Sequence, residues 1–120
     1  KKAKYHAAAS ILSNQVIAVL DMGYTLLEDC GFTRNEAVRA TGQLVMRNIE
    51  NVLEAGCDGA LTGPIERNDI ETVKKHIACM QNDYSDDVRL YKMLGTKLVN
   101  IAEKKNPDKD YTQMMELLRG

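Results

Sequence analysis

The chain has 120 residues, of which 44% are hydrophobic and 28% charged, and its formal net charge at pH 7 is −1. This composition is typical of one folded globular domain and excludes a disordered chain. Acidic and basic residues are interspersed and aromatic residues make up only 5%. The chain therefore lacks the basic surface and the stacking platforms that bind nucleic acid, and we expect no nucleic-acid partner.

Three cysteines, Cys30, Cys57 and Cys79, are widely spaced and odd in number. No CxxC pair and no Cys/His pair has the spacing of metal ligands, so we expect no metal, and we expect buried or half-buried free thiols in a reducing cytosol. No apolar run approaches the length of a membrane span and no signal peptide precedes the domain, so we expect a cytoplasmic protein without a membrane partner. The chain opens at Lys1 without an initiator Met, which predicts a processed protein or a piece of a larger one.

The first half of the chain predicts two long helices. From Ala3 to Asp29 there is no Pro and only one Gly. Gly31 is expected to end this helix, because glycine readily adopts the left-handed conformation that follows a helix end. Thr33 and Glu36 predict a capping box that begins a second helix, which we expect to reach about Ala55. The apolar stripes of these two helices are expected at Val16, Leu20, Tyr24 and Leu27, and at Val38, Val45, Ile49 and Val52. Gly42, inside the second helix, predicts close packing against another helix.

The second half predicts three more helices after a break over Gly56–Arg67, which is rich in Gly and contains Pro64. Asn68 and Glu71 predict a second capping box, and the fourth helix is expected to end before Pro107. The predicted apolar faces of these three helices are Ile70, Val73, Ile77 and Met80; Val88, Tyr91, Leu94, Leu98 and Ile101; and Tyr111, Met114, Met115 and Leu118. With no strand pattern anywhere, we predict an all-α fold of about five helices, two of them long, in one domain over residues 1–120.

The first helix carries an unusual polar face. At about 100° per residue, eight residues project within a sector of about 100°, and in the N-terminal half these are His6, Ser10, Ser13 and Asn14. Short neutral polar groups on an alanine-rich surface suit a ligand cleft, and a histidine can move a proton near neutral pH. The alternative is a polar face that packs against another subunit or faces water.

The Gly59–Ile65 segment is the second distinctive stretch. Gly63 before Pro64 predicts an extended kink, and Thr62 beside it can turn its hydroxyl into a bordering cavity. The alternative is an ordinary connection between helices. The glycines form neither a dinucleotide fingerprint nor a P-loop, and no nucleophile elbow or HExxH motif is present.

Together the two stretches resemble a known family. Tyr5-His6-Ala7-Ala8-Ala9 with Ser13-Asn14, and Ala60-Leu61-Thr62-Gly63-Pro64-Ile65 with Asp69 and Thr72-Val73, are similar to the uncharacterised helical C-terminal domain of proposed NADP-dependent oxidoreductases. The N-terminal half of those proteins is a Rossmann domain, and they resemble the 6-phosphogluconate dehydrogenase and pyrroline-5-carboxylate reductase superfamily. The resemblance covers nearly the whole chain, from Tyr5 to about Ala102.

The resemblance implies a fold, an assembly and site residues. The fold is the helical bundle of that superfamily's C-terminal domain, which commonly forms homodimers and closes a substrate cleft against the nucleotide domain. Relatives use a Lys and an Asn one turn apart, and Ser10 and Asn14 occupy the corresponding positions, so the Lys is absent here. The implied catalytic residues are then His6 and Asn14, and the implied substrate-binding residues are Ser10, Ser13, Thr62 and Gly63. Asn68 stands where the family has Gly, and Asn tolerates left-handed angles.

The resemblance also implies what this chain lacks. Nothing in it can cradle a pyrophosphate, so we expect no cofactor on this domain and NADP in the full-length protein. The expected function is the substrate-cleft and dimerisation domain of an NAD(P)-dependent oxidoreductase, with a Rossmann domain in cis, a small-molecule substrate and no activity alone. The alternative is a non-catalytic helical oligomerisation or interaction module of unknown function. The first hypothesis predicts that His6, Asn14 and Thr62 converge on one pocket, and the second predicts a large apolar interface.

Overall fold

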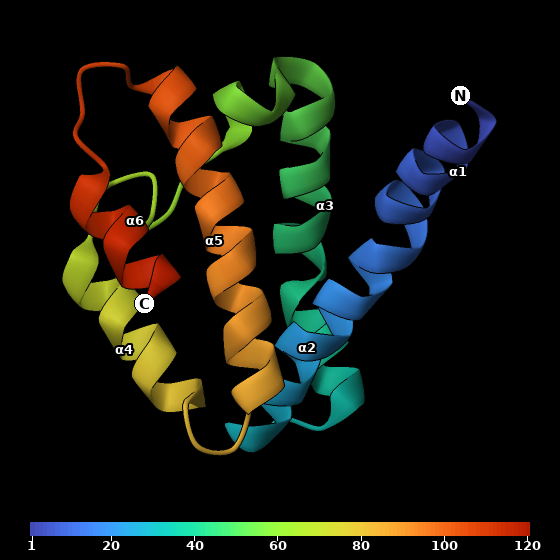
Figure 1. The fold of residues 1–120 in the computed structure, drawn as a ribbon. Helices are drawn as coiled ribbons and strands as arrows, with labels where there is room; N and C mark the ends of the chain where they lie inside the picture. The colour runs from blue at the N-terminus through green and yellow to red at the C-terminus, as the bar shows by residue number, and fades with distance from the viewer. The chain divides into compact units, whose positions relative to one another are not determined.

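A computed structural model describes residues 1–120 and contains helices and turns but no strand. The helical segments are α1 (Lys2–Ser10), the π-helical η1 (Ile11–Gln15), α2 (Val16–Asp29), α3 (Arg34–Ala60), α4 (Ile70–Met80), α5 (Ser85–Lys105) and α6 (Thr112–Arg119). The segments α1, η1 and α2 run on from one another as a single helix of 28 residues, as Figure 1 shows. The prediction of an all-α fold with five helices is confirmed, although three helices rather than two are long.

The chain divides into two compact units, residues 1–46 and residues 47–120, and each is described by itself. The first unit contains the long N-terminal helix and the first part of α3. Its sharp turn follows from the predicted signals. Gly31 has φ +105°, and the backbone N–H of Phe32 and of Gly31 donate to the carbonyls of Leu27 and Glu28, which completes a Schellman motif.

The predicted capping box at the start of α3 is also present. The Thr33 side chain accepts from the N–H of Glu36 at 3.1 Å, and the Glu36 carboxylate accepts from the N–H of Thr33 at 2.8 Å. Arg34 then ties α3 to α2 through ion pairs with Asp21 at 3.0 Å and Glu28 at 2.9 Å. All of these residues are at least partly exposed, so local geometry and not a core shapes this turn.

The first unit has almost no core, since Ala37 is its only buried residue. Its large apolar side chains are instead exposed, among them Leu12 at 78% and Leu44 at 72%. The predicted apolar stripes of the first two helices are therefore only partly buried, and Val16 and Val38 in them are exposed. The close packing predicted at Gly42 is wrong within this chain, because a Cβ placed there would meet no atom within 4 Å.

The helix Lys2–Asp29 is long and apolar enough to cross a membrane by length and composition alone. Its mean hydropathy reaches 1.2 over 18 residues, and none of that window is buried. The expectation that no apolar run approaches this length therefore does not hold by this measure. One such helix near the N-terminus is a weak indication, since signal sequences and core helices share these properties. Its polar positions, His6, Ser10 and Asn14, are also unfavourable in lipid.

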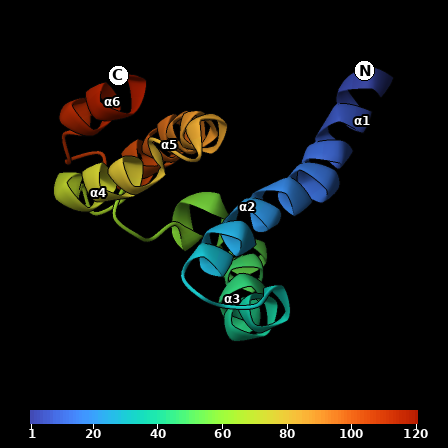
Figure 2. The ribbon, with the colours of Figure 1, turned by 90° about the horizontal axis from the view of Figure 1, so that it is seen from below.

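The second unit has a core between α4, α5 and α6, which lie side by side in both Figure 1 and Figure 2. Its buried apolar side chains come from all three helices and from the loops before α4 and α6: Ile65, Val73, Ile77, Met80, Val88, Val99, Ala102, Tyr111, Met114 and Leu118. The predicted faces of α4 and α6 are confirmed at most positions. Burial of these side chains stabilises the unit by about 25 cal/mol for each Å² of apolar surface.

The buried face of α5 differs from the prediction. Of the predicted apolar stripe only Val88 is buried. The other buried residues of α5 each lie one position later than a predicted one: Gly95, Val99 and Ala102. The predicted residues before them, Leu94, Leu98 and Ile101, are half-buried. Gly95 explains this choice. A Cβ placed on it would lie 2.8 Å from Leu118 Cδ2, so α6 can approach α5 this closely only where α5 has no side chain.

The start of α4 differs from the prediction by one residue. Asp69 and not Asn68 is the N-cap, since its carboxylate accepts from the N–H of Thr72 at 3.1 Å and from the Thr72 hydroxyl at 2.7 Å. These two hydrogen bonds from Thr72 lower the pKa of Asp69 below its ordinary value. Asn68 has φ +62°, as expected for the position of a family glycine, and its side chain donates to the carbonyl of Asp110 at 2.8 Å.

Candidate functional site

The predicted catalytic residues lie on the N-terminal helix around its π-helical segment. His6 and Ser10 belong to α1, and Ser13 and Asn14 lie inside the π-helical turn Ile11–Gln15. A π-helix is a rare, wider turn that is found mostly as single insertions in α-helices, frequently at functional sites. No pattern in the sequence predicts this turn, and no residue type in ILSNQ specifies it.

The π-helical turn changes which polar groups are available to a ligand. The Ser13 hydroxyl donates to the carbonyl of Ala9 at 2.6 Å, and the Ser10 hydroxyl donates to Gln15 Oε1 at 3.0 Å. Both serine hydroxyl protons are therefore engaged in hydrogen bonds within the helix, and only the oxygen lone pairs are available to a ligand. The side chains of His6 and Asn14 are exposed and make no hydrogen bond or ion pair within the chain.

The π-helical turn also alters the register of the predicted polar face. A projection at a constant 100° per residue assumes α-helical geometry from His6 to Glu28, and this does not hold across residues 11–15. The face therefore divides into an N-terminal part, with His6 and Ser10, and a C-terminal part that begins after Gln15.

The predicted Thr62–Gly63 loop lies in the second unit. The regular part of α3 ends at Gly56, which has φ +78° and ψ 174°, and Gly63 has φ +98°. The predicted break over 56–67 is thus confirmed at both glycines, and the predicted helix end at Ala55 is correct. Thr62 is exposed and lines a hollow of about 210 Å³, which we call the Thr62 hollow. Its lining residues come from α3, the loop and α5: Asn48, Val52, Cys57, Ala60, Leu61, Thr62, Leu98 and Ile101.

Side chains from the end of α5 and the segment after it hold this loop in place. Lys105 Nζ donates to the carbonyl of Leu61 at 2.7 Å. The Tyr111 hydroxyl donates to the carbonyl of Glu66 at 2.6 Å, and Asn106 Nδ2 donates to the Glu66 carboxylate at 2.9 Å. The Asn106 hydrogen bond and the nearby charges of Lys109 and Lys105 lower the pKa of Glu66 despite an opposing effect of burial.

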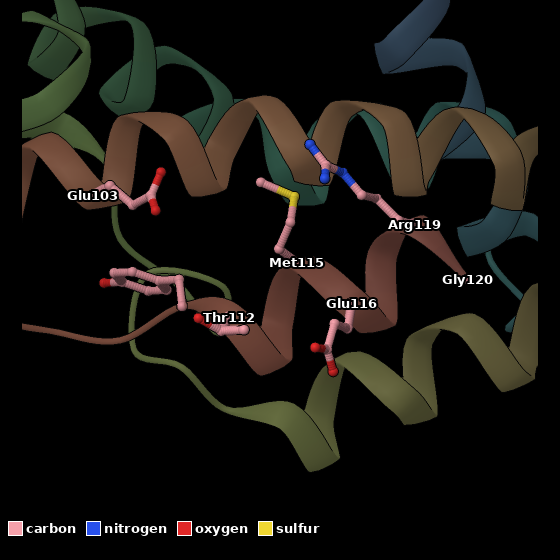
Figure 3. A pocket seen from close by; sticks show the side chains of 7 residues that line it. Glu103, Thr112, Met115, Glu116, Arg119 and Gly120 are labelled. Atoms are coloured by element: carbon pink, nitrogen blue, oxygen red, sulfur yellow. The ribbon is translucent and has the colours of Figure 1, made fainter.

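A second hollow, of about 560 Å³, lies beside α6 and the C-terminal turn of α5 (Figure 3). It is lined by Glu103, Tyr111, Thr112, Met115, Glu116, Arg119 and Gly120. Met115 and Arg119 point from α6 towards α5 in Figure 3, whereas Glu116 points away from α5. None of the predicted site residues lines this hollow.

The third hollow is a groove of about 340 Å³ in the first unit, which we call the α2–α3 groove. It is lined almost entirely by apolar atoms of Val19, Leu20, Gly23, Tyr24, Leu27, Thr41, Leu44 and Val45. A groove with almost no accessible polar atoms offers little to orient a small substrate, and it suits contact with another apolar surface.

A histidine on α4 and a tyrosine on α5 also contact each other. Neither is one of the predicted site residues. His76 Nδ1 lies 2.9 Å from the Tyr91 hydroxyl. Burial, and to a smaller extent the nearby Cys79, raises the pKa of Tyr91 above its ordinary value. This half-buried pair links two helices of the core, which is sufficient to explain its geometry.

The three cysteines are all exposed, so the expectation that their thiols are buried or half-buried is wrong. No group of three His, Cys, Asp or Glu side chains is arranged to hold a metal. The N-terminus of α4, where a phosphate could bind, already carries the Asp69 carboxylate, and Arg67 beside it pairs with Asp69 at 3.8 Å. The N-terminus of α4 is therefore already occupied by a carboxylate and does not suit a phosphate.

The predicted site residues thus fall in two places. His6, Ser10, Ser13 and Asn14 belong to the first unit, and Thr62 and Gly63 belong to the second. Their convergence on one pocket stays a prediction. Asn48 and Cys57 also line the Thr62 hollow and were not predicted. Cys57 lies inside the predicted break, which could have indicated it, whereas no sequence signal indicates Asn48.

Comparison with known proteins gives one family. No curated protein and no solved structure matches the chain. The model of a domain of unknown function, DUF2520, matches residues 1–98. That range contains the π-helical turn, both predicted motifs and the Thr62 loop, and ends within α5. The chain therefore belongs to the DUF2520 family.

Proposed function

We propose that this chain is the substrate-cleft and dimerisation domain of an NAD(P)-dependent oxidoreductase. In this proposal a Rossmann domain in the same polypeptide holds NADP, because the glycines of the present chain form neither a dinucleotide fingerprint nor a P-loop. The domain supplies substrate contacts and a subunit interface and has no activity alone. The substrate is a small molecule, and the protein acts in the cytoplasm, where its three exposed free thiols remain reduced.

The observation that carries the proposal is the π-helical turn at Ile11–Gln15. It coincides with Ser13 and Asn14 and directly follows Ser10, which are the positions that the family resemblance assigns to the cleft. A π-helix costs hydrogen-bond geometry, and such turns are frequent at functional sites. The coincidence therefore favours a functional role over a merely solvated face.

The chemistry that these residues could perform follows from their free groups. The His6 imidazole can transfer a proton to or from a substrate, because neither ring nitrogen is engaged within the chain. The Asn14 amide can donate to a substrate oxygen or accept from a substrate N–H or O–H. Ser10 and Ser13 can contribute only lone pairs as acceptors, since their protons are already donated. Thr62 has an exposed hydroxyl with no partner in the chain.

Dimerisation is proposed from the first unit. A unit of 46 residues with one buried side chain cannot offset the conformational entropy that ordering it costs. Its exposed apolar residues and the α2–α3 groove need a partner surface. A second copy of the chain presents a matching apolar surface, as two-fold symmetric interfaces require.

The same exposed surface favours the alternative function, a non-catalytic helical oligomerisation module. The two functions differ in what they demand of His6 and Asn14. The oxidoreductase proposal needs both side chains free and facing a cleft, whereas an oligomerisation module tolerates their replacement by alanine.

Activity of the full gene product tests this difference. NADPH oxidation is followed with a panel of small carbonyl and imine compounds, for the wild type and for His6→Ala and Asn14→Ala. We expect His6→Ala to lower kcat by about 10²–10⁴, the usual contribution of a positioned proton donor. His76→Gln removes the other histidine but keeps a side chain that can hydrogen-bond to Tyr91, and it serves as the matched control and keeps its activity. Full activity of both His6→Ala and Asn14→Ala would contradict the catalytic assignment and favour the oligomerisation module.

A further inference from the structure

The Thr62 hollow combines apolar walls with a few polar groups. Val52, Leu98 and Ile101 give it an aliphatic lining, and Asn48, Cys57 and Thr62 contribute one amide, one thiol and one hydroxyl. No charged side chain lines it. Small-molecule sites typically have this composition, in which apolar walls supply affinity and a few polar groups fix orientation.

The aliphatic walls are not explained by the core. Leu98 and Ile101 belong to the face of α5 that the sequence pattern assigns to the interior, yet both are only half-buried. Val99 and Ala102, one position later, are fully buried against the other helices. The larger side chains therefore remain on the face of α5 that lines the hollow.

The rim of the hollow is formed before any ligand arrives. Gly56 and Gly63, both at positive φ, delimit the segment between them. Within it, the N–H of Leu61 donates to the carbonyl of Cys57 at 3.1 Å, and the carbonyl of Leu61 accepts from Lys105 Nζ at 2.7 Å. The Lys105 ammonium therefore reaches this segment, where it is engaged with the backbone.

We propose that the Thr62 hollow binds a compact uncharged group, either a short aliphatic chain or a small ring, that carries one neutral hydrogen-bonding function. Asn48 and Thr62 satisfy that function, and Val52, Leu98 and Ile101 enclose the apolar part. The identification of this group as one end of the oxidoreductase substrate rests on the proposed function. The binding of such a group to the hollow does not. Carboxylates and phosphates are disfavoured, since no lining cation repays their desolvation.

The size of the hollow limits what enters. A volume of about 210 Å³ corresponds to about seven water molecules at about 30 Å³ each. Pockets that enclose a whole drug-sized ligand measure about 300–1,000 Å³. The hollow therefore suits a small molecule or one end of a larger one.

Cys57 allows this proposal to be tested without knowing the natural ligand. The 120-residue chain is prepared with Cys57 as its only thiol, by Cys30→Ser and Cys79→Ser. It is incubated with two probes, each a mixed disulfide between cysteamine and an N-acylated cysteamine. The acyl group is cyclohexanecarbonyl in one probe, which is uncharged, and succinyl in the other, which carries a carboxylate. Thiol–disulfide exchange attaches the probe to Cys57 and releases cysteamine, and intact mass measures the yield under a fixed concentration of reductant. The matched control keeps Cys79 alone, which is exposed on α4.

We expect Cys57 to prefer the cyclohexanecarbonyl probe over the succinyl probe by roughly tenfold or more relative to Cys79, as burial of a small apolar group implies. Leu98→Asp is expected to abolish that preference. Because Leu98 is half-buried and its replacement can unfold the chain, Thr62→Lys is the second variant. Thr62 is exposed, and a cation at the rim is expected to shift the preference several-fold towards the succinyl probe.

Equal preferences at Cys57 and Cys79 would overturn the proposal, as would a Thr62→Lys variant with an unchanged preference. Nucleotide binding by the full gene product is measured separately and does not depend on this hollow. Failure of the ligand proposal and failure of the oxidoreductase proposal are therefore distinguishable.

Discussion

Gly95 marks the closest helix contact in the second unit, and replacing it with alanine tests the packing directly. A Cβ at this position would lie 2.8 Å from Leu118 Cδ2, 3.1 Å from Leu118 Cδ1 and 3.4 Å from Ile65 Cδ1. Both neighbours are buried, Leu118 at 2% exposure and Ile65 at 6%. Any relief must therefore come from displacing packed side chains.

The magnitude follows from two opposing effects. Alanine in place of glycine inside a helix stabilises it by about 1 kcal/mol, whereas overpacking a core typically costs about 1–3 kcal/mol. We expect Gly95→Ala to lower the free energy of unfolding by about 0–2 kcal/mol. The control is Asn100→Ala on the same helix, which is exposed and is expected to raise stability by up to about 0.7 kcal/mol.

Urea denaturation monitored by circular dichroism measures these changes. A double-mutant cycle adds Leu118→Ala, which alone is expected to cost about 2–5 kcal/mol. Its cost should fall in the Gly95→Ala background, because the clash is then removed, with a coupling of about 0.5–3 kcal/mol. A Gly95→Ala variant stabilised by a full 1 kcal/mol, with no coupling to Leu118, would refute this account of how α5 and α6 pack.

Three further predictions concern the loop, the N-cap and the turn. Tyr111→Phe removes the hydroxyl that donates to the carbonyl of Glu66 and should cost about 1–3 kcal/mol, since that buried pairing is lost, as measured by urea denaturation. The depressed pKa of Asp69 means that its contribution to stability is present above the ordinary value of 3.8 and is lost as pH falls through the lower folded value. Asp69→Asn, which retains an N-cap oxygen, should therefore reduce the loss of stability below about pH 4 in acid titrations. Gly31→Ala places a Cβ at φ +105° and should destabilise the turn by more than about 1 kcal/mol, seen as a lower midpoint in thermal unfolding.

Each of these has a control and a contrary result. Tyr5→Phe, at an exposed tyrosine, should leave stability unchanged, and a Tyr111→Phe variant that does the same would contradict the clamp on Glu66. An Asp69→Asn variant with the same acid sensitivity as the wild type would show that other carboxylates, such as Glu66 and Asp110, dominate. No effect of Gly31→Ala would mean that the turn is not held in this geometry.

Local signals made most of the fold predictable. Gly31 and the Thr33–Glu36 box placed the first turn correctly, because backbone conformation and capping depend on neighbours in the sequence. The break at Gly56 and the end of α5 before Pro107 were predicted for the same reason. The offset of the buried face of α5 was not predictable. It depends on Gly95 meeting Leu118, a contact between residues 23 positions apart in the sequence.

The candidate site was less predictable than the fold. Motif resemblance singled out Asn14 and Thr62, but nothing in the sequence specifies the π-helical turn that surrounds Asn14. Asn48 enters the Thr62 hollow only because α3, the loop and α5 meet there. The choice of Asp69 over Asn68 as the N-cap also required the structure, since both residue types are good caps.

The most direct test of the oxidoreductase proposal is a titration of the full gene product with NADPH and NADH, followed by nucleotide fluorescence. The account predicts saturable binding by the full product and none by the present chain, whose glycines form neither a dinucleotide fingerprint nor a P-loop. Absence of binding by the full product, or equal binding by this chain alone, would contradict the proposed division of roles between a nucleotide domain and this helical domain.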